Sequence, residues 1–401
     1  MTTATDDRYT VISADCHAGG SMDQYREYLD PKYADDFADW RGAYKNPFRD
    51  LQKDDSRVRN WDDERRIGDL EADGIVGEVV FPNTVPPFFP TGALVARPPA
   101  TKEELDQRWA GLRAHNRWLV DWCANHPEKR AGIAQIFLND VDLAVAEAEW
   151  VAQSGLRGGI LLPTVPDDTD IEPLFSKVYD PLWRVCEEAG MPVNLHSGSG
   201  QPDYGDAPAA GMMWLVETAW FAHRPLWQLL LSGVFERFPT MKFVMTEQGC
   251  SWILPLLPQF DAFHQQAKRG RIGELKFPAE EQLPMKPSEY IRRNVYLGVS
   301  FPGPGEARAM KKLGIDRVMW GADYPHHEGS TPYSRELMRM SFSDWDEADL
   351  RQVFTDTAVD VYGFEPDKLA PRARDVGPTV EELKVPLEST PEGATSPGFF
   401  R

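Results

Sequence analysis

The sequence predicts a distorted (β/α)8 barrel, and three observations favour this fold class. Eight short apolar runs, each bounded by turn residues, alternate with segments whose apolar residues recur at helical spacing. The runs are nearly continuous in apolar residues, which is typical of parallel strands buried on both faces. The first run is not followed by a glycine-rich phosphate loop, so a doubly wound sheet is only the second choice of fold.

The predicted strands recur along the whole chain of 401 residues. Each one is a β-branched or apolar run, such as YTVISADC near the start of the chain. Their ranges are about 9–16, 75–81, 131–138, 156–162, 191–196, 242–247, 294–300 and 317–323.

The predicted helices lie in the intervals between these strands. Their ranges are about 101–126, 140–154, 174–189, 212–236, 249–266 and 304–313. The last helix is expected to end at Gly314, because glycine is the residue that most often follows a helix C-terminus. Eight strands alternating with helices give the element order of a (β/α)8 barrel.

The domain organisation follows from where the chain departs from a minimal barrel. We expect residues 1–365 to form the barrel and the proline-rich residues 366–401 to form an extended C-terminal arm. Two insertions, 30–65 and 82–100, follow the first and second strands, at the end of a barrel where active-site loops lie. Packing of the arm on a second subunit would make the protein a homodimer.

Charge and composition limit the classes of partner. The chain has 43 Lys and Arg against 63 Asp and Glu, a net charge of −20, which disfavours nucleic acid or an anionic membrane as a partner. No apolar run approaches the roughly 18 residues of a membrane span, and the first residues lack the features of a signal peptide. Four scattered cysteines fit a reducing compartment. We therefore expect a cytoplasmic protein with a small-molecule substrate.

Polar residues at the ends of four predicted strands indicate a metal site. In a barrel the carboxyl ends of the strands converge on one mouth, where two imidazoles and three carboxylates would repel or stay unpaired without a cation. The expected metal ligands are Asp15, His17, His196, Glu247 and Asp323. This donor set suits Fe, Zn or Mn, with one or two ions per chain. Five candidates exceed the needs of one ion, so either one is a general base or a carboxylate bridges two ions.

Two histidines are candidates for catalysis beside the metal. His326 and His327 follow Asp323 closely, and one of them, with His326 as the preferred candidate, is expected to reach the site as a ligand or as a donor to an oxyanion. His223 lies on the predicted helix after the fifth strand and is a candidate acid or substrate contact. Aromatic residues on the mouth-side segments are expected to line a hydrophobic chamber. They are Phe88, Phe89, Trp214, Trp220 and Trp252.

The motifs ADCH, NLHSG, GVFERFPTMKFVMTEQGCSWI and MWGADYPHHEG resemble those of the amidohydrolase superfamily. The similarity is greatest to its amidohydrolase-2 branch, whose members resemble aminocarboxymuconate-semialdehyde decarboxylase, and it covers about residues 9–365. The resemblance implies a metal-dependent hydrolase or a non-oxidative decarboxylase on a distorted (β/α)8 barrel. It implies that Asp15, His17, His196 and Asp323 bind metal, and that Asp323 also takes the proton of a metal-bound water.

One departure from the family pattern decides the expected reaction. Glu247 stands where many decarboxylases of the branch have a histidine that acts as acid or base, and a glutamate donates protons to carbon poorly at neutral pH. We therefore expect a metal-dependent hydrolase, most specifically a thioesterase for a bulky hydrophobic acyl-CoA. The strand-8 motif is similar to that of actinobacterial relatives that include a diterpenoid acyl-CoA thioesterase. The alternatives are a decarboxylase of an aromatic or unsaturated acid, and a barrel without activity that serves as a binding module.

Overall fold

Parallel strands form the centre of the structure, a computed structural model that describes residues 7–44, 54–91, 96–163, 165, 169–198, 204–205, 207–279 and 282–400. Three strands pair in the order β1-β2-β3, and six pair in the order β11-β10-β7-β6-β5-β4. The first sheet comprises β1 (Val11–Ala18), β2 (Ile75–Pro82) and β3 (Arg130–Gly132). The second comprises β4 (Ala134–Gln135), β5 (Ile160–Leu161), β6 (Val193–His196), β7 (Phe243–Thr246), β10 (Val295–Ser300) and β11 (Val318–Gly321).

The two sheets meet at both of their edges. At one edge β3 and β4 are two pieces of a single predicted strand, and the Ile133 amide between them donates to the Val80 carbonyl at 3.0 Å. At the other edge Cys16 and Tyr324 form a parallel bridge, and the Asp323 amide donates to the Asp15 carbonyl at 2.8 Å. The eight strand positions confirm the predicted (β/α)8 barrel.

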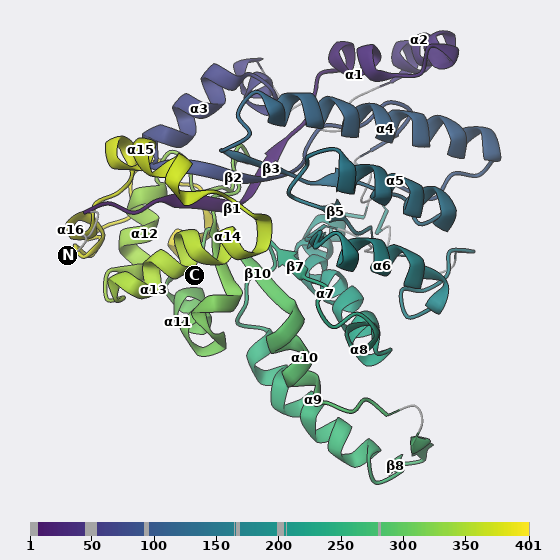
Figure 1. Cartoon of the computed structure of the whole chain (residues 1–401). Helices are drawn as coiled ribbons and strands as arrows, with labels where there is room; N and C mark the ends of the chain where they lie inside the picture. The colour runs from purple at the N-terminus through teal and green to yellow at the C-terminus, as the bar shows by residue number, and fades with distance from the viewer. Residues whose placement is uncertain are drawn as a thin grey trace.

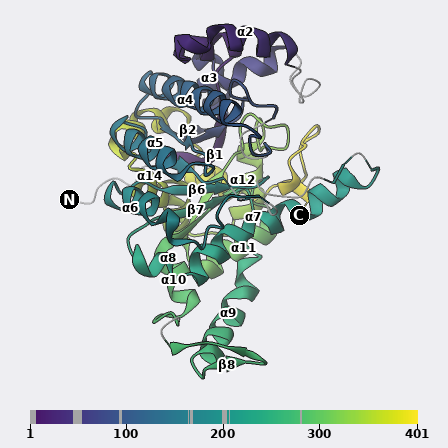
Figure 2. The same ribbon diagram turned by 90° about the vertical axis from the view of Figure 1, so that its right-hand side faces the viewer.

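Helices surround the strands, as Figures 1 and 2 show. Thr101 and Asp140 each accept a hydrogen bond from a backbone amide of the first turn of α4 and α5, so each of these helices begins at a capping residue. The helices that match the predicted ranges are α4 (Lys102–Ala124), α5 (Val141–Gln153), α6 (Asp180–Glu188), α7 (Ala210–Leu231), α8 (Val234–Arg237), α9 (Ile253–Ala267) and α11 (Pro304–Leu313). The far end of α9 and the small hairpin β8 (Arg271–Ile272) and β9 (Leu275–Lys276) extend away from the barrel (Figures 1 and 2).

The barrel interior is a separate apolar core. Side chains from strands all around the barrel, including Ile12, Val79, Leu161 and Val244, pack together in it. Ile12 and Ala14 of β1 both belong to this core, whereas Cys16 belongs to the core between strands and helices. The pairing register of β1 and β2 shifts between Ser13 and Cys16. Such an irregularity changes which residues face inward. After it, Asp15 and His17 face the barrel interior, although Ile12 and Ala14 face the interior before it.

The C-terminal segment, described here for residues 366–400, packs on the barrel of its own chain. It includes α15 (Pro366–Val376), α16 (Val380–Leu383) and a final 3-10 turn, Pro397–Phe400. Leu369 and Ala373 of α15 are buried against the interior core, together with residues of α14 (Thr357–Tyr362). The predicted division at residue 365 stays a prediction, but this part of the chain is helical and docked where an extended arm was expected.

The insertion predicted at 30–65 contains helical elements. These are α2 (Ala34–Ala43), the 3-10 segment Asp54–Asn60 and the start of α3 (Asp63–Ala72), and α1 (Met22–Tyr28) precedes them. Parts of the two predicted insertions, 45–53 and 92–95, lie outside the described residues. Within the described part of the chain, no helix has both the length and the apolar character that a bilayer crossing requires.

Candidate metal centre

The structure brings all five predicted ligands to the carboxyl ends of the strands. Asp15 and His17 lie on β1 and His196 ends β6, while Glu247 and Asp323 follow β7 and β11. The Nε2 atom of His17 is 3.3 Å from Asp15 Oδ1 and also 3.3 Å from Asp323 Oδ1. The Nε2 atom of His196 is 3.4 Å from Asp15 Oδ1. Residues separated by up to 308 positions in the chain therefore share one small volume.

The far ring nitrogens of the two histidines contact backbone carbonyls. Nδ1 of His17 lies 3.3 Å from the Pro82 carbonyl, and Nδ1 of His196 lies 3.0 Å from the Ser197 carbonyl. A carbonyl only accepts hydrogen bonds, so Nδ1 of each histidine carries a proton, and Nε2 turns its lone pair to the centre once its own proton is lost. Histidines that bind metals are oriented in this way by their second nitrogen.

The central atoms fit a divalent cation. Asp15, His17 and Asp323 are almost fully buried. Asp323 Oδ2 has no hydrogen-bond partner among the described residues, and Asp15 Oδ1 and Asp323 Oδ1 contact only histidine nitrogens of the same cluster in the described ion pairs. Buried carboxylates without partners are costly unless a cation compensates them. Two imidazoles and two carboxylates are ligands that Mn, Fe and Zn accept.

The charges of these groups depend strongly on one another. Burial favours the neutral form of Asp15, but contacts with His17 and His196 hold its pKa well below the usual range. Burial lowers the pKa of His17, but Asp15 and Asp323 outweigh burial and raise it to about 9. Burial likewise lowers the pKa of His196, and Glu247 and Asp15 raise it to about 9. Protons on the two histidines thus balance the carboxylates when no metal is bound.

His326 and Glu247 form the second half of the site. Nδ1 of His326 lies 2.7 Å from Asp323 Oδ1, and its ring stacks on the His17 ring with centroids 4.0 Å apart. Oε2 of Glu247 accepts a hydrogen bond of 2.6 Å from the Ser197 hydroxyl. Burial and the nearby Asp323 carboxylate raise the pKa of Glu247 above its usual value. One potential ligand atom from each of four residues lies within 4.8 Å of the others. These residues are Glu247, Asp323, His326 and Glu328.

Backbone geometry at the strand ends is unusual and places these side chains. Glu247 and Asp323 have φ of 60° and 58°, in the left-handed region that residues other than glycine seldom adopt. Such strain is typical of functional sites. Gly321 on β11 leaves room for Asp15, because a Cβ atom at position 321 would lie 2.7 Å from the Asp15 Cβ. A strained backbone at Glu247 and Asp323 and close packing at Gly321 therefore bring the candidate ligands together.

His223, the other predicted catalytic residue, has a different environment. Its ring stacks on Trp252 with centroids 3.5 Å apart and also faces Trp227. Burial lowers its pKa to about 4. None of its described ring contacts is with a metal-centre residue, so its catalytic role stays a prediction.

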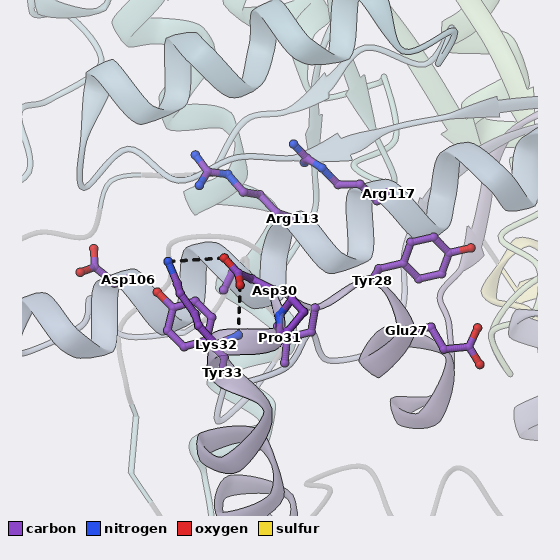
Figure 3. Close-up of a pocket in the computed structure, with 11 residues that line it drawn as sticks. Glu27, Tyr28, Asp30, Pro31, Lys32, Tyr33, Asp106, Arg113 and Arg117 are labelled. Atoms are coloured by element: carbon purple, nitrogen blue, oxygen red, sulfur yellow. Dashed lines mark hydrogen bonds and ion pairs between the residues drawn. The ribbon is translucent and has the colours of Figure 1, made fainter.

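The expected hydrophobic chamber does not form from the aromatic set that was predicted. Phe89 stacks on Phe137 in one small core, and Phe88 packs with Phe37 in another, because the loop after β2 folds back against its neighbouring helices. Trp214 and Trp220 are 41% and 51% exposed. A pocket of about 420 Å³ lies elsewhere, between residues 27–33 and α4 (Figure 3). Its lining includes Arg113 and Arg117 and none of the predicted site residues.

Several residues of the site were not predicted. Ser300 donates to Asp15 Oδ2, Ser197 donates to Glu247, and Asn83 contacts His326. Asn83, Ser197 and Ser300 lie at or directly after strand ends, so the rule that found the ligands could also have found them. Asn60, which contacts Asn83, lies outside any strand and carries no such signal in the sequence.

Comparisons with known proteins agree with this architecture. A family model described as Amidohydrolase matches residues 40–364. The γ-resorcylate decarboxylase of Polaromonas sp. (strain JS666 / ATCC BAA-500) is 26% identical over an alignment of 226 residues. The alignment covers 53% of this chain and 65% of the relative. The chain thus matches less than two thirds of the length of this curated relative.

Two solved structures share the fold at low sequence identity. An amidohydrolase from Mycobacterium avium subsp. paratuberculosis K-10 has a TM-score of 0.67 and 20% identity, with 90% of this chain and 100% of that chain covered. The 5-carboxyvanillate decarboxylase of Novosphingobium aromaticivorans DSM 12444 has a TM-score of 0.64 and 19% identity, with 90% and 100% covered. The latter was solved with manganese and 4-hydroxy-3-methoxy-5-nitrobenzoic acid.

The expected thioesterase activity is wrong. The γ-resorcylate and 5-carboxyvanillate enzymes are decarboxylases, which agrees with the alternative reaction and not with thioester hydrolysis. The expectation assumed that Glu247 holds no proton near neutral pH. Burial and Asp323 raise its pKa, which weakens the physical objection to a glutamate as proton donor.

Proposed function

The chain belongs to the amidohydrolase family, and from this premise we propose that it is a metal-dependent, non-oxidative decarboxylase of an aromatic carboxylic acid. The family is one of metal-dependent enzymes. The proposed substrate is a benzoic acid with a phenolic hydroxyl, the substrate class named for the γ-resorcylate and 5-carboxyvanillate decarboxylases. The observation that best supports the proposal is that a buried set of candidate metal ligands lies directly beside two groups able to hold a proton.

Asp15, His17, His196 and Asp323 are the residues we propose to hold the cation. Bound there, a divalent ion such as manganese would supply positive charge that neutralises and orients the anionic groups of the substrate. Ser300 holds one oxygen of Asp15, which leaves the other oxygen directed at both histidines. The chain thereby fixes its donor atoms before any ligand arrives, which lowers the cost of binding.

Decarboxylation replaces a carbon–carboxylate bond with a carbon–hydrogen bond. The site must therefore deliver one proton to the ring carbon and release CO2, with the electron pair of the broken bond staying on the ring. His326 and Glu247 are the proposed sources of that proton. Burial lowers the pKa of His326, but the Asp323 and Glu247 carboxylates outweigh burial and raise it. Both carboxylates thus favour a proton on the His326 ring beside Asp323.

A direct assay tests the proposal. Protein stripped of metal and reloaded with Mn²⁺ is incubated with γ-resorcylate, with 5-carboxyvanillate and with benzoate, and CO2 and the ring product are quantified. We expect CO2 from at least one phenolic acid, none from benzoate, and one deuterium in the product made in D2O. We expect His326→Gln to lower kcat by about 10²-fold or more while the metal content stays unchanged. Metal-loaded protein that releases no CO2 from either phenolic acid would contradict this function.

A further inference from the structure

We propose that Asn83 and Asn60 are positioning residues that hold a proton on Nε2 of His326 and present Nδ1 to Asp323. This inference deepens the proposed function, because it rests on His326 acting beside the metal. It concerns two residues outside the ligand set, and neither contacts the metal ligands through its side chain in any described contact. The two asparagines belong to different segments, the 3-10 turn before α3 and the loop after β2.

Three hydrogen bonds run in series from the backbone carbonyl of Arg57 through the two asparagines to His326, and the carbonyl fixes the direction of each one. The carbonyl of Arg57 can only accept, so the atom of Asn60 that contacts it at 3.0 Å is the donor Nδ2. Oδ1 of Asn60 then faces Asn83 and accepts from Nδ2 of Asn83 at 2.6 Å. This leaves Oδ1 of Asn83 to face Nε2 of His326 at 3.0 Å.

An amide oxygen accepts and never donates, so Nε2 of His326 must be the donor in the last contact. Reversal of the Asn60 amide would bring two acceptors together at the Arg57 carbonyl, and reversal of Asn83 alone would bring two acceptors together at Asn60 Oδ1. The two asparagines therefore keep a proton on Nε2, while Nδ1 faces Asp323 Oδ1 at 2.7 Å and donates to that carboxylate whenever the ring carries its second proton. The nitrogen next to the reacting centre is thereby always Nδ1.

The positions of both asparagines are fixed by their own backbones. The Asn83 amide donates to the Ala18 carbonyl at 2.8 Å, and the Asn60 carbonyl accepts from Gly19 at 3.2 Å. Both contacts lead to residues directly after the ligands of β1. Asn60 is only 4% exposed, so water competes little for its amide. The His326 ring is also held by stacking on His17, which opposes a flip that would exchange its edges.

Nuclear magnetic resonance can determine the tautomer of His326 in protein that has no catalytic activity. Metal-free protein labelled with ¹⁵N-histidine is studied at one fixed pH, chosen high enough that the His326 ring is neutral, by correlation spectra that join ring nitrogens to carbon-bound ring protons. The signals of His326 are assigned by their loss in His326→Gln. In the wild type we expect Nε2 at the shift of a protonated nitrogen. In Asn83→Leu, which has no acceptor, we expect that shift to move toward the average of the two tautomers.

Matched variants separate positioning from a merely structural role. Asn83→Asp keeps an acceptor toward Nε2, so it should retain the wild-type shift even if the fold is less stable. Asn125→Leu removes an amide whose partner is Asp63 and should leave the His326 signals unchanged. In the metal-loaded enzyme, Asn83→Leu should lower kcat roughly 10- to 100-fold, as when the partner of a site histidine is removed, with KM changed less than about twofold.

Two results would overturn the inference. One is a wild-type spectrum in which Nε2 has the shift of an unprotonated nitrogen, and this needs no variant to fold. The other is a folded Asn83→Leu variant whose His326 shifts equal those of the wild type. If no aromatic acid is decarboxylated, the proposed function fails, while the spectra still decide whether the two asparagines set the tautomer.

Discussion

Raising the pH from 7 to 9 should strengthen metal binding steeply. In the metal-free protein the pKa values of His17 and His196 are both about 9. At pH 7 each ring therefore carries a proton that competes with the metal for Nε2, because a histidine binds metal only in its neutral form. Asp15 does not oppose this trend, since its pKa lies well below the usual range and it stays ionised throughout.

The size of the effect follows from the two pKa values. Removing one proton at two pH units below its pKa costs about 2.7 kcal/mol, since one unit corresponds to about 1.4 kcal/mol. Two histidines together cost about 5 kcal/mol at pH 7, an affinity loss of up to roughly 10⁴-fold relative to pH above 9. The logarithm of the association constant should rise with a slope near 2 below about pH 8, fall to a slope of about 1 near pH 9 and level off above that.

A competition titration measures this dependence. The apparent Kd for Mn²⁺ is determined against a fluorescent chelator from pH 6.5 to 9.5, and calorimetry in two buffers of different ionisation enthalpy counts the protons released. We expect nearly two protons released at pH 7, and about half the slope in His17→Gln. An affinity that does not change with pH, or release of no protons at pH 7, would refute the reasoning about these histidines.

Three further substitutions test other parts of the structure. Gly321→Ala places a Cβ 2.7 Å from the Asp15 Cβ and should displace that side chain. The Kd for Mn²⁺, measured by the same titration, should therefore rise about tenfold or more. An unchanged Kd would argue against Asp15 as a ligand. Glu247→Gln removes a proton donor and should lower kcat about 10²-fold with KM nearly constant, whereas loss of bound metal would identify Glu247 as a ligand instead. Burial raises the pKa of Asp73 to about 6, above the roughly 3.9 of an unfolded chain. Its ionisation therefore costs stability as pH rises from 4 to 6, and Asp73→Asn should gain roughly 2 kcal/mol over the wild type at pH 7 and nothing at pH 4 in urea unfolding. Equal curves at both pH values would show that Asp73 ionises freely.

The sequence was informative about the barrel because its strands are buried on both faces. Runs such as 242–247 and 294–300 therefore stand out as apolar segments between turn residues, and they correspond to β7 and β10. The helices between them were visible from their apolar spacing. The segment 366–401 was harder, because its few buried residues, such as Leu369, are too sparse to show a helical pattern.

The identity of the candidate ligands was also accessible from the sequence. Parallel barrel strands bring their carboxyl ends to one mouth, so a polar residue that ends a buried strand is expected there without any coordinates. This rule was sufficient for His196 and for Asp323. It could not give the reaction, because the competence of Glu247 as an acid depends on burial and on the distance to another carboxylate, which only the folded chain sets.

By itself, then, the sequence determined the barrel, the mouth and the residues that meet there, because these follow from local patterns of apolar and polar residues. The tertiary structure alone decided how those residues act. The strained backbone at Glu247 and Asp323, and the chain of amides from Arg57 to His326, join segments far apart in sequence. Protonation and tautomer depend on distances of a few ångströms between such segments, and the order of residues does not encode those distances locally.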